Sequence, residues 1–402
     1  MLSKMHSPLL KHGTIVIVHN LRNRFFLSDY GLQEVPLMVS AADIAVRPYL
    51  RRAIRATGIK AHLGSSGPIL VDSGGYSLMT AAHAPFKIDD LIELYRYLKA
   101  DAYAALDLPP SPGDSRKVRS GKWQATLSNL DRMLKALPDA RLMPVIHGHS
   151  LDEIVSACRD IQRRTDCPPI VALGGMVPFL RGQMSGQHFS YKRANGFSGT
   201  GETFLADAIS TCRTEFPSSH IHVFGAGSTT TAVALFSLGA HSVDSLAWRR
   251  AAGFGTIFLA GLAERTVSSK ERLRESRPRL TAKDRELLKQ CRCPVCVKHP
   301  KIEDKMDALG ASYVARAVHN VWTLRAEETA FRRAKAKGYI AAFAVSRISV
   351  RHRFAEIITE RFQDRWPTES AHRPRRMPLA PRPVVAEGGN PQMTYRFFRT
   401  FR

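Results

Sequence analysis

Two short stretches of the sequence carry side chains that could do chemistry. Residues 242–250 read SVDSLAWRR, so Asp244 follows a strand-like start and precedes Arg249 and Arg250. An aspartate in this setting is either an ordinary turn carboxylate or a nucleophile beside a basic surface that holds a phosphate backbone. Residues 291–300 read CRCPVCVKHP and contain three of the six cysteines. This second stretch indicates metal binding.

The cysteine cluster predicts a structural zinc site. Three thiolates as close together as Cys291, Cys293 and Cys296 favour a soft metal, for which tetrahedral zinc is the usual choice. The fourth ligand is either His299, close in sequence, or His319, within a helical pattern. We favour His319, which would staple a loop to a helix. Four protein ligands leave no position for water, so the zinc is expected to be structural. The alternative is reduced cysteines without a metal.

Apolar, β-branched runs recur along the first 250 residues and predict the strands that position these side chains. They lie at 36–40, 69–74, 103–108, 142–148, 170–175, 221–227 and 242–246, with residues 14–18 or another early run as an eighth. Helical spacing fills the intervals, as in residues 88–100 and 151–164. Strands that alternate with helices form parallel sheets, and eight of them match a (β/α)₈ TIM barrel. A doubly wound open sheet is the alternative, which the lack of Gly-x-Gly-x-x-Gly after the first strand disfavours.

Polar residues and glycines stand at the carboxyl ends of these predicted strands: Asp72, Asp107, His147, Gly174, Gly175, Gly225, Gly227 and Asp244. Barrels assemble their active sites from the loops on this face. Each residue alone has the simpler interpretation of a turn or a cap. Their repetition on different strands favours one shared active site.

Three polar stretches interrupt the alternation. Residues 111–124 and 181–202 are basic and contain glycine, and we predict long loops over the same face. Residues 268–289 are strongly basic and lead into the cysteine cluster. The predicted organisation has three parts. They are a catalytic barrel over residues 1–265, a zinc-binding subdomain with closing helices over 266–345, and a basic, partly disordered C-terminal extension over 346–402.

The net charge of +24 over 402 residues indicates a polyanionic partner, because each neutralised phosphate releases a counterion. No apolar run approaches the roughly 18 residues of a membrane-spanning helix, so membrane binding is disfavoured. The N-terminal residues lack the pattern of a signal peptide, and the scattered Cys158, Cys167 and Cys212 fit a reducing compartment. We therefore expect a cytoplasmic protein that binds nucleic acid and no membrane.

Taken together, the motifs resemble the tRNA-guanine transglycosylase superfamily. They are VDSGGYSLMT, ALDLPP, ALGGMVP, the glycines of FGAGS, the aspartate of SVDSLAWRR, and the cysteine cluster followed by His-Asn. Proteins of that superfamily are barrels with an inserted zinc subdomain, and they exchange guanine for a 7-deazaguanine in nucleic acid. The resemblance covers about residues 35 to 325.

The resemblance implies that Asp244 is the nucleophile that attacks the sugar C1′ and that Asp72 is the general acid/base. Breaking an N-glycosidic bond builds positive charge at C1′, which an anionic carboxylate stabilises before it bonds to the carbon. A second carboxyl group protonates the departing guanine and later deprotonates the incoming base. Retaining glycosidases use this double displacement, which needs two acids on opposite sides of one bond.

The resemblance also implies how the base is held. Tyr76 corresponds to an aromatic residue that stacks on the base, and Asp107 to the carboxylate that reads the guanine edge. His147 lies where bacterial tRNA enzymes carry glutamine; it either bonds the base or satisfies a buried neighbour. Gly174 and Gly175 match glycines whose backbone faces the base.

The nucleic acid must present its target nucleotide unpaired or flipped out of a duplex. In the resemblance, Arg249 and Arg250 would hold the flanking phosphate, and Trp248 would wedge or stack. The alternative is a solvated basic face with Trp248 packed inward. The sequence does not decide whether a partner ATPase or helicase opens the duplex, or whether the protein forms a homodimer.

Two departures from the bacterial tRNA enzymes favour a DNA substrate. Those enzymes continue after the nucleophile with Cys-Val-x-Pro-Thr-Arg and carry a glutamate after the ALGG position, whereas this chain has SLAWRR and MVPFL. Both features look more like the DpdA-type branch, which inserts 7-deazaguanines such as preQ0 into DNA, although archaeal tRNA enzymes share the ALGG-x-VP loop. The expected function is guanine exchange in DNA. The alternatives are the same reaction on tRNA, of queuosine or archaeosine type, and a non-catalytic nucleic-acid-binding partner subunit.

Overall fold

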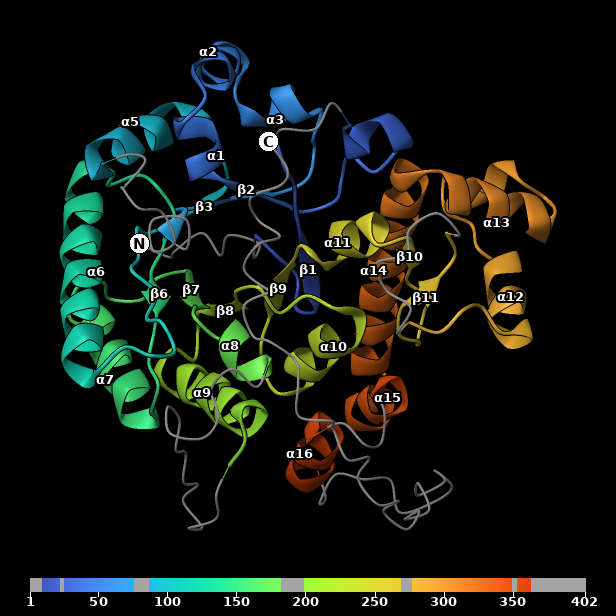
Figure 1. The fold of residues 1–402 in the computed structure, drawn as a ribbon. Helices are drawn as coiled ribbons and strands as arrows, with labels where there is room; N and C mark the ends of the chain where they lie inside the picture. Colours follow the sequence, from blue (N-terminus) through green and yellow to red (C-terminus); the bar gives the residue numbers. More distant parts are fainter. Residues whose placement is uncertain are drawn as a thin grey trace. The chain divides into compact units, whose positions relative to one another are not determined.

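The described chain forms one barrel of parallel strands inside a ring of helices (Figure 1). The computed structural model describes residues 9–21, 25–75, 87–181, 199–268, 277–348 and 353–362, which fall within a compact unit from Met1 to Trp366. Its strand segments are β1 (Thr14–Val18), β2 (Leu37–Ser40), β3 (Ile69–Asp72), β4 (Ala102–Ala104), β5 (Leu142–Met143), β6 (Val145–Ile146), β7 (Ile170–Leu173), β8 (His220–Val223) and β9 (Ser242–Ser245).

Pro144 explains why the sheet has nine segments rather than eight. β5 and β6 are two halves of one run, and proline, which has no N–H, interrupts the ladder between them. β5 pairs with β4 and β6 pairs with β7, so this run joins the two edges of the sheet. The carbonyl of Pro144 itself accepts from the Ala172 N–H at 2.9 Å. The predicted (β/α)₈ barrel, with residues 14–18 as the eighth strand, is confirmed.

Helices follow the strands and form the outer ring of Figure 1: α1 (Ala41–Ala45), α2 (Pro48–Thr57), α3 (Ile59–Leu63), α5 (Ile88–Leu98), α6 (Arg116–Ala136), α7 (Leu151–Gln162), α8 (Val177–Leu180), α9 (Gly201–Glu215), α10 (Thr229–Ser237) and α11 (Ala247–Gly253). Serine side chains cap three of them, α6, α7 and α10. Ser150 Oγ accepts from Glu153 N at 3.2 Å at the start of α7, and Ser228 Oγ accepts from Thr231 N at 3.2 Å at the start of α10. Such caps satisfy N–H groups that a helix leaves unbonded at its first turn.

The strand alternation decides which side chains point into the barrel. A buried cluster fills its interior: Val16, Met38, Leu70, Ala102, Ala104, Met143, Val145, Ile170 and Ala172. Side chains two residues apart on a strand share a face, so Asp72 points to the same side as Leu70. Asp244 is paired in register with Val16 of β1 and shares its face. The fold therefore directs both aspartates into the barrel.

Helix α6 corrects the prediction of a long loop over residues 111–124. The helix begins at Arg116, directly after its N-cap Ser115. Its buried positions, Thr126, Leu127, Leu130 and Met133, all lie in its second half, so its basic first half carries no apolar periodicity. The other predicted loop, 181–202, falls mostly on residues 182–198, outside the described part of the chain; α9 begins at Gly201.

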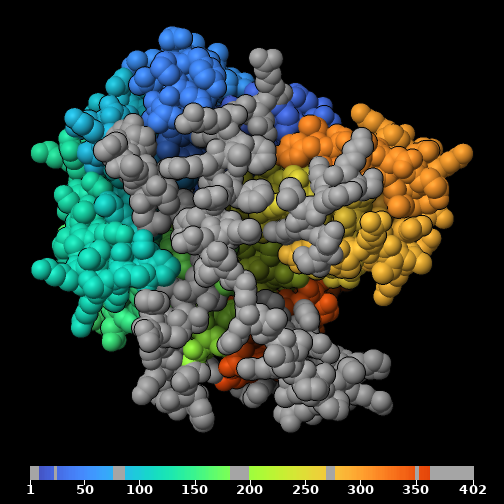
Figure 2. Space-filling model, in the orientation of Figure 1, coloured from blue at the N-terminus to red at the C-terminus, as the bar shows by residue number. Residues whose placement is uncertain are grey.

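Beyond the barrel lie the antiparallel pair β10 (Thr256–Ile257) and β11 (Arg265–Thr266), followed by α12 (Ala282–Lys289), α13 (Ile302–Ala311), α14 (Tyr313–Ala336), α15 (Ile340–Arg347) and α16 (Arg353–Arg361). Figure 2 shows α12 and α13 as a lobe at one side of the molecule. α14 ties this part to the barrel, since the Glu328 carboxylate accepts from the Ile15 N–H of β1 at 2.6 Å. Residues 363–402, most of the predicted C-terminal extension, are outside the described residues.

Candidate active site and metal centre

Three carboxylates stand at the carboxyl ends of the barrel strands. Asp72 is the last residue of β3, Asp107 lies just beyond β4, and Asp244 lies in β9. Asp107 and Asp244 are buried, and Asp72 is half-buried. The negative charges of Asp107 and Asp244 both act on the Asp72 carboxyl, so the three groups lie near one another. The structure thus brings together the two acids that the sequence pattern placed 172 residues apart (244 minus 72).

Asp72 has the electrostatics of a group that exchanges protons at neutral pH. Burial, and then the charges of Asp107 and Asp244, raise the pKa of Asp72 to about 7. Hydrogen bonds from Gly74 N, at 3.3 Å, and from the Ser40 side chain oppose this rise. Loss of water and nearby like charges both favour the uncharged acid. A carboxyl group with a pKa near the working pH is suited to general acid and base roles.

We expect the Asp72 carboxyl to titrate near pH 7, well above the ordinary value of about 4 for an aspartic acid. Infrared difference spectra across this range should show a protonated-carboxyl band in the wild-type protein that Asp72→Asn removes. Asp107→Asn should move the titration to lower pH, because it removes one of the like charges. The exposed Asp139, changed to asparagine, is the matched control. Complete ionisation of Asp72 at pH 5 would contradict the assignment.

Two side chains hold Asp107. Ser73 Oγ donates to Oδ1 at 2.9 Å, and His147 Nε2 lies 2.8 Å from Oδ2. A carboxylate only accepts, so Nε2 of His147 carries a proton and its Nδ1 presents a lone pair in the neutral ring. That Nδ1 is buried and has no hydrogen-bond partner among the described residues. Buried polar atoms are normally satisfied, so a bound molecule is expected to supply the partner.

Glycines at three positions let the backbone pack closely against the His147 ring and the Asp107 carboxylate. A Cβ added to Gly174 would lie 2.5 Å from His147 Cε1. Gly175 has φ +72°, and a Cβ there would lie 3.3 Å from His147 Nδ1. A Cβ on Gly75 would lie 2.6 Å from Asp107 Oδ1. Only glycine permits these close approaches.

Asp244 is held at one carboxylate oxygen. Gly225 N donates to Oδ1 at 2.6 Å, and His222 Nε2 lies 3.5 Å from the same oxygen. Gly225 has φ +74°, in the left-handed region that favours glycine, and a Cβ on Gly227 would lie 2.4 Å from the Asp244 carbonyl. Among the described residues no hydrogen bond holds Oδ2. That oxygen is the one suited to attack.

The residues after Asp244 divide between core and surface. Trp248 is 2% exposed, and its Nε1 donates to the Val18 carbonyl at 3.2 Å, so it packs inward and does not stack on a nucleic acid. Arg249 is half-buried and its Nε donates to the Tyr313 hydroxyl at 3.1 Å. Arg250 is exposed on α11. Of the three, Arg250 presents most of its side chain to a phosphate.

Some residues of the site escaped the sequence analysis. The roles of Ser40 and Ser73 depend on strand register and on a turn, for which serine carries no distinctive signal. His222 lies inside a strand, where alternation predicted only a core position. Tyr76, the predicted stacking residue, lies outside the described residues.

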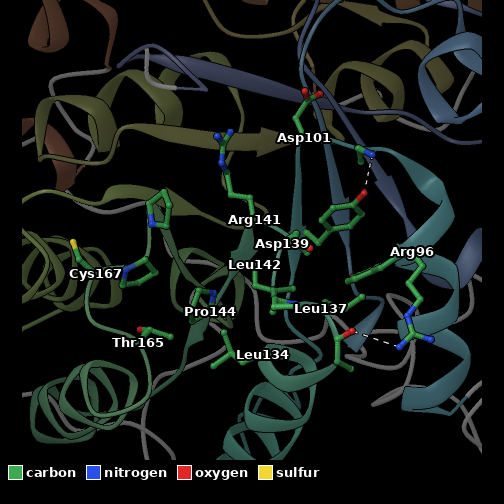
Figure 3. A pocket seen from close by; sticks show the side chains of 18 of the residues that line it. Arg96, Asp101, Leu134, Leu137, Asp139, Arg141, Leu142, Pro144, Thr165 and Cys167 are labelled. Atoms are coloured by element: carbon green, nitrogen blue, oxygen red, sulfur yellow. Dashed lines mark hydrogen bonds between the residues drawn. The ribbon is translucent and has the colours of Figure 1, made fainter. Parts of the chain in front are cut away.

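Two cavities open on opposite ends of the barrel. One of about 620 Å³ lies on the carboxyl end beside His147, between α6 and α7, with Arg116 and Trp123 in its lining. A larger one of about 1000 Å³ lies at the amino ends of β4, β5 and β7, and Figure 3 shows Arg141 and Cys167 among its side chains. The larger cavity contains none of the predicted site residues.

A second cluster gathers at the start of the lobe. Cys291, Cys293, Cys296 and His319 place their ligand atoms within 4.8 Å of one another. The three sulfurs lie 3.5, 3.6 and 3.6 Å from His319 Nδ1. Tetrahedral zinc, with Zn–S and Zn–N bonds of about 2.3 and 2.0 Å, would separate sulfur and nitrogen by about 3.6 Å. The geometry can therefore hold a metal ion of this kind, with His319 rather than His299 as the fourth ligand.

The surroundings of the cluster favour metal ligation. His319 Nε2 lies 2.9 Å from the Phe258 carbonyl and donates to it, which leaves Nδ1 free to bind a metal. Cys296 N donates to Cys293 Sγ at 3.3 Å, an N–H···S bond that suits a thiolate. Next to His319, the Asn320 amide donates to the Trp248 carbonyl at 2.9 Å. One turn of α14 thus connects the metal cluster to the helix that follows Asp244.

Fold and site together define a (β/α)₈ barrel with acidic groups at its mouth and an appended cluster of three cysteines and one histidine. The family model described as "Queuine tRNA-ribosyltransferase" matches residues 32–353. The chain belongs to this family, which confirms the resemblance to the tRNA-guanine transglycosylase superfamily.

Curated relatives carry one name, "tRNA-guanine(15) transglycosylase". The protein from Haloarcula marismortui is 24% identical over 314 residues, 74% of this chain and 54% of the relative. The protein from Methanosarcina acetivorans is 23% identical over 72% of this chain and 52% of the relative. The protein from Methanobrevibacter smithii is 21% identical over 58% of this chain and 33% of the relative. The chain thus spans between a third and about half of the length of these relatives. Among its described residues, no helix combines the length and apolarity needed to cross a membrane.

Proposed function

We propose that this protein exchanges guanine in a nucleic acid for a 7-deazaguanine through a covalent intermediate on Asp244. Asp244 Oδ2 bonds to the sugar C1′ while the bond from C1′ to guanine breaks, and the bonding electron pair leaves with guanine. Asp72 gives its proton to that base. The incoming base then returns a proton to Asp72, its nitrogen bonds to C1′, and the Asp244 ester bond breaks. The overall reaction retains the configuration at C1′.

The observation that carries this proposal is the raised pKa of Asp72, caused in part by Asp107 and Asp244. Asp72 can then hold a proton near neutral pH and give it to a base. Different environments for two neighbouring carboxyl groups are what a nucleophile and an acid/base require.

Base recognition follows from the groups beside Asp72. In this proposal Asp107 accepts N–H groups of guanine, and the unpartnered Nδ1 of His147 meets the same base edge. Gly174 and Gly175 are proposed to face the base through their backbone, as the family resemblance implies. Tyr76 is proposed to stack on it, as the family resemblance implies. Arg249 and Arg250 are proposed to contact the backbone phosphate.

We infer that the nucleic acid is tRNA. The curated relatives are tRNA-guanine(15) transglycosylases, and the family model is named for a tRNA reaction. The hypothesis of a DNA substrate with preQ0 has no support in these comparisons. It rested in part on the SLAWRR segment, whose Trp248 has a packing role. The high positive charge suits either polymer.

We further propose that the ion bound by the cysteines and His319 is structural zinc. Four protein ligands fill a tetrahedral site and leave no place for a reacting water. The proposed division of the chain is unchanged: a barrel over 1–265, the zinc subdomain over 266–345, and a basic extension over 346–402.

An exchange assay with radiolabelled guanine tests the function. The protein is incubated with unmodified tRNA and, separately, with plasmid DNA, and incorporation into each polymer is followed. We expect label in tRNA and none in DNA. Label in DNA alone would overturn the choice of polymer. Label in neither, with binding retained, would favour the non-catalytic partner subunit.

A further inference from the structure

A buried chain of three polar side chains leads to the nucleophile from inside the barrel. His222 of β8 and Ser242 of β9 are fully buried. His222 Nδ1 lies 2.8 Å from Ser242 Oγ, and Ser242 Oγ lies 2.7 Å from His220 Nε2. On the other side of the His222 ring, Nε2 lies 3.5 Å from Asp244 Oδ1. Nε2 has no hydrogen-bond partner among the described residues.

The number of protons on these three side chains decides the direction of the hydrogen bonds between them. The Ser242 hydroxyl has one proton, so it can donate to only one of the two rings and must accept from the other. If Ser242 donates to His220, the one proton of a neutral His222 ring lies on Nδ1 and is donated to Ser242. The lone pair of His222 Nε2 then faces the Asp244 carboxylate. If Ser242 donates to His222, the His222 proton sits on Nε2 and faces that carboxylate. Two lone pairs repel, so the anion selects the second arrangement.

The neutral state of His220 agrees with this arrangement. Burial, and then His241 and His222, lower the pKa of His220 to about 2, so that ring is neutral and has one proton, here on Nε2. If His222 were protonated on both nitrogens, Nε2 would still donate towards Asp244. Every arrangement that tolerates an anionic Asp244 therefore presents an N–H to its Oδ1.

We propose that His222 is a positioning residue for Asp244. Its ring, oriented through Ser242 and His220, holds Oδ1 so that Oδ2 faces the sugar carbon. Gly225 N, two residues beyond the carboxyl end of β8, holds the same oxygen. Oδ1 accepts both in the free carboxylate and in the ester, so these contacts persist while Oδ2 forms and breaks its bond. At 3.5 Å the His222 contact is long, and we expect it to shorten when substrate binds. The inference rests on the proposed function.

The test uses three changes at one buried position. Glutamine can place an N–H where Nε2 of His222 stands, whereas asparagine can reach only Ser242, and phenylalanine keeps the ring volume without either polar atom. With saturating tRNA, we expect His222→Asn and His222→Phe to slow the single-turnover release of guanine by about 10–100-fold, the effect of one hydrogen bond to a charged group. His222→Gln should stay within a few-fold of wild type. Binding of tRNA should not change in any of them.

Controls separate positioning from folding. His62→Asn changes a half-buried histidine of α3 that lies outside this group of side chains, and should leave the rate unchanged. Ser242→Ala keeps His222 in place but removes the hydroxyl whose hydrogen bond orients its ring, and should slow release by several-fold. This variant tests the proposal if the His222 variants do not fold. Equal rates for asparagine and wild type, or equal defects for glutamine and phenylalanine, would overturn the inference.

The outcome for the wild-type protein separates two failures. Exchange by wild type, together with a normal rate in Ser242→Ala and His222→Asn, would remove the role of His222 and leave the proposed function standing. Absence of exchange in the wild type would remove the proposed function and this inference with it.

Discussion

Replacing Asp244 by asparagine is expected to abolish guanine exchange while tRNA binding persists. The amide has the same shape and can still accept from Gly225 N, so the local fold should hold. It lacks the negative charge that stabilises C1′ and the nucleophilic oxygen that bonds to it. Loss of a nucleophile in comparable double-displacement enzymes costs about 10⁴- to 10⁶-fold in turnover, and we expect an effect in that range.

The measurement compares exchange rates and tRNA binding by fluorescence anisotropy. Asp139→Asn makes the same chemical change on an exposed residue that lines the cavity at the amino end of the barrel. It should leave both quantities unchanged. Because loss of the Asp244 charge also lowers the pKa of Asp72, rates are compared across neutral and mildly acidic pH. Exchange at more than a tenth of the wild-type rate would contradict the role of Asp244.

Replacing Cys293 by serine should cost the protein its metal and much of its stability. Cys293 is fully buried within the cluster, and serine is a poor ligand for a soft metal. Structural zinc contributes about 10–16 kcal/mol to the folding of small zinc domains, so one missing ligand is severe. The loss of stability should extend to the active site, because Asn320, next to His319, donates a hydrogen bond to the backbone of the helix that follows Asp244.

Metal content and thermal unfolding measure this effect together. We expect about one zinc ion per chain in the wild-type protein, and in Cys293→Ser a loss of zinc with a large fall in Tm. Cys167→Ser is the matched control, because Cys167 is an exposed cysteine outside the cluster. A strong chelator should reproduce the Cys293→Ser result in the wild type. An unchanged Tm after complete removal of the metal would rule out a structural role.

The sequence permitted prediction of the barrel, of the cluster of three cysteines with His319 and of the acidic mouth, because each leaves a strong local signal. Strand runs such as residues 14–18 and 170–175 are short and β-branched, and the cysteine spacing is distinctive. Features with a weak signal in the sequence could not be predicted. The first half of α6 buries no side chain, so its sequence lacks the apolar periodicity that predicts a helix. Trp248 has no pattern that tells a core position from a stacking one.

Other features of the site depend on register and could not be predicted from spacing. The Ser73–Asp107–His147 bonds join three separate segments of the chain. The His222–Ser242–His220 chain needs β8 and β9 side by side, with His222 paired to Ser242. The raised pKa of Asp72 depends on burial and on two distant charges. Each of these properties arises only when the barrel closes.

The most direct test of the central claim is to isolate the intermediate. The protein is mixed with tRNA without an incoming base, quenched in denaturant and digested, and the peptides are examined by mass spectrometry. We predict a nucleic-acid adduct on the peptide that contains Asp244, absent from Asp244→Asn and formed more slowly in Asp72→Asn. Guanine exchange with no adduct on that peptide, or an adduct on another residue, would contradict the account.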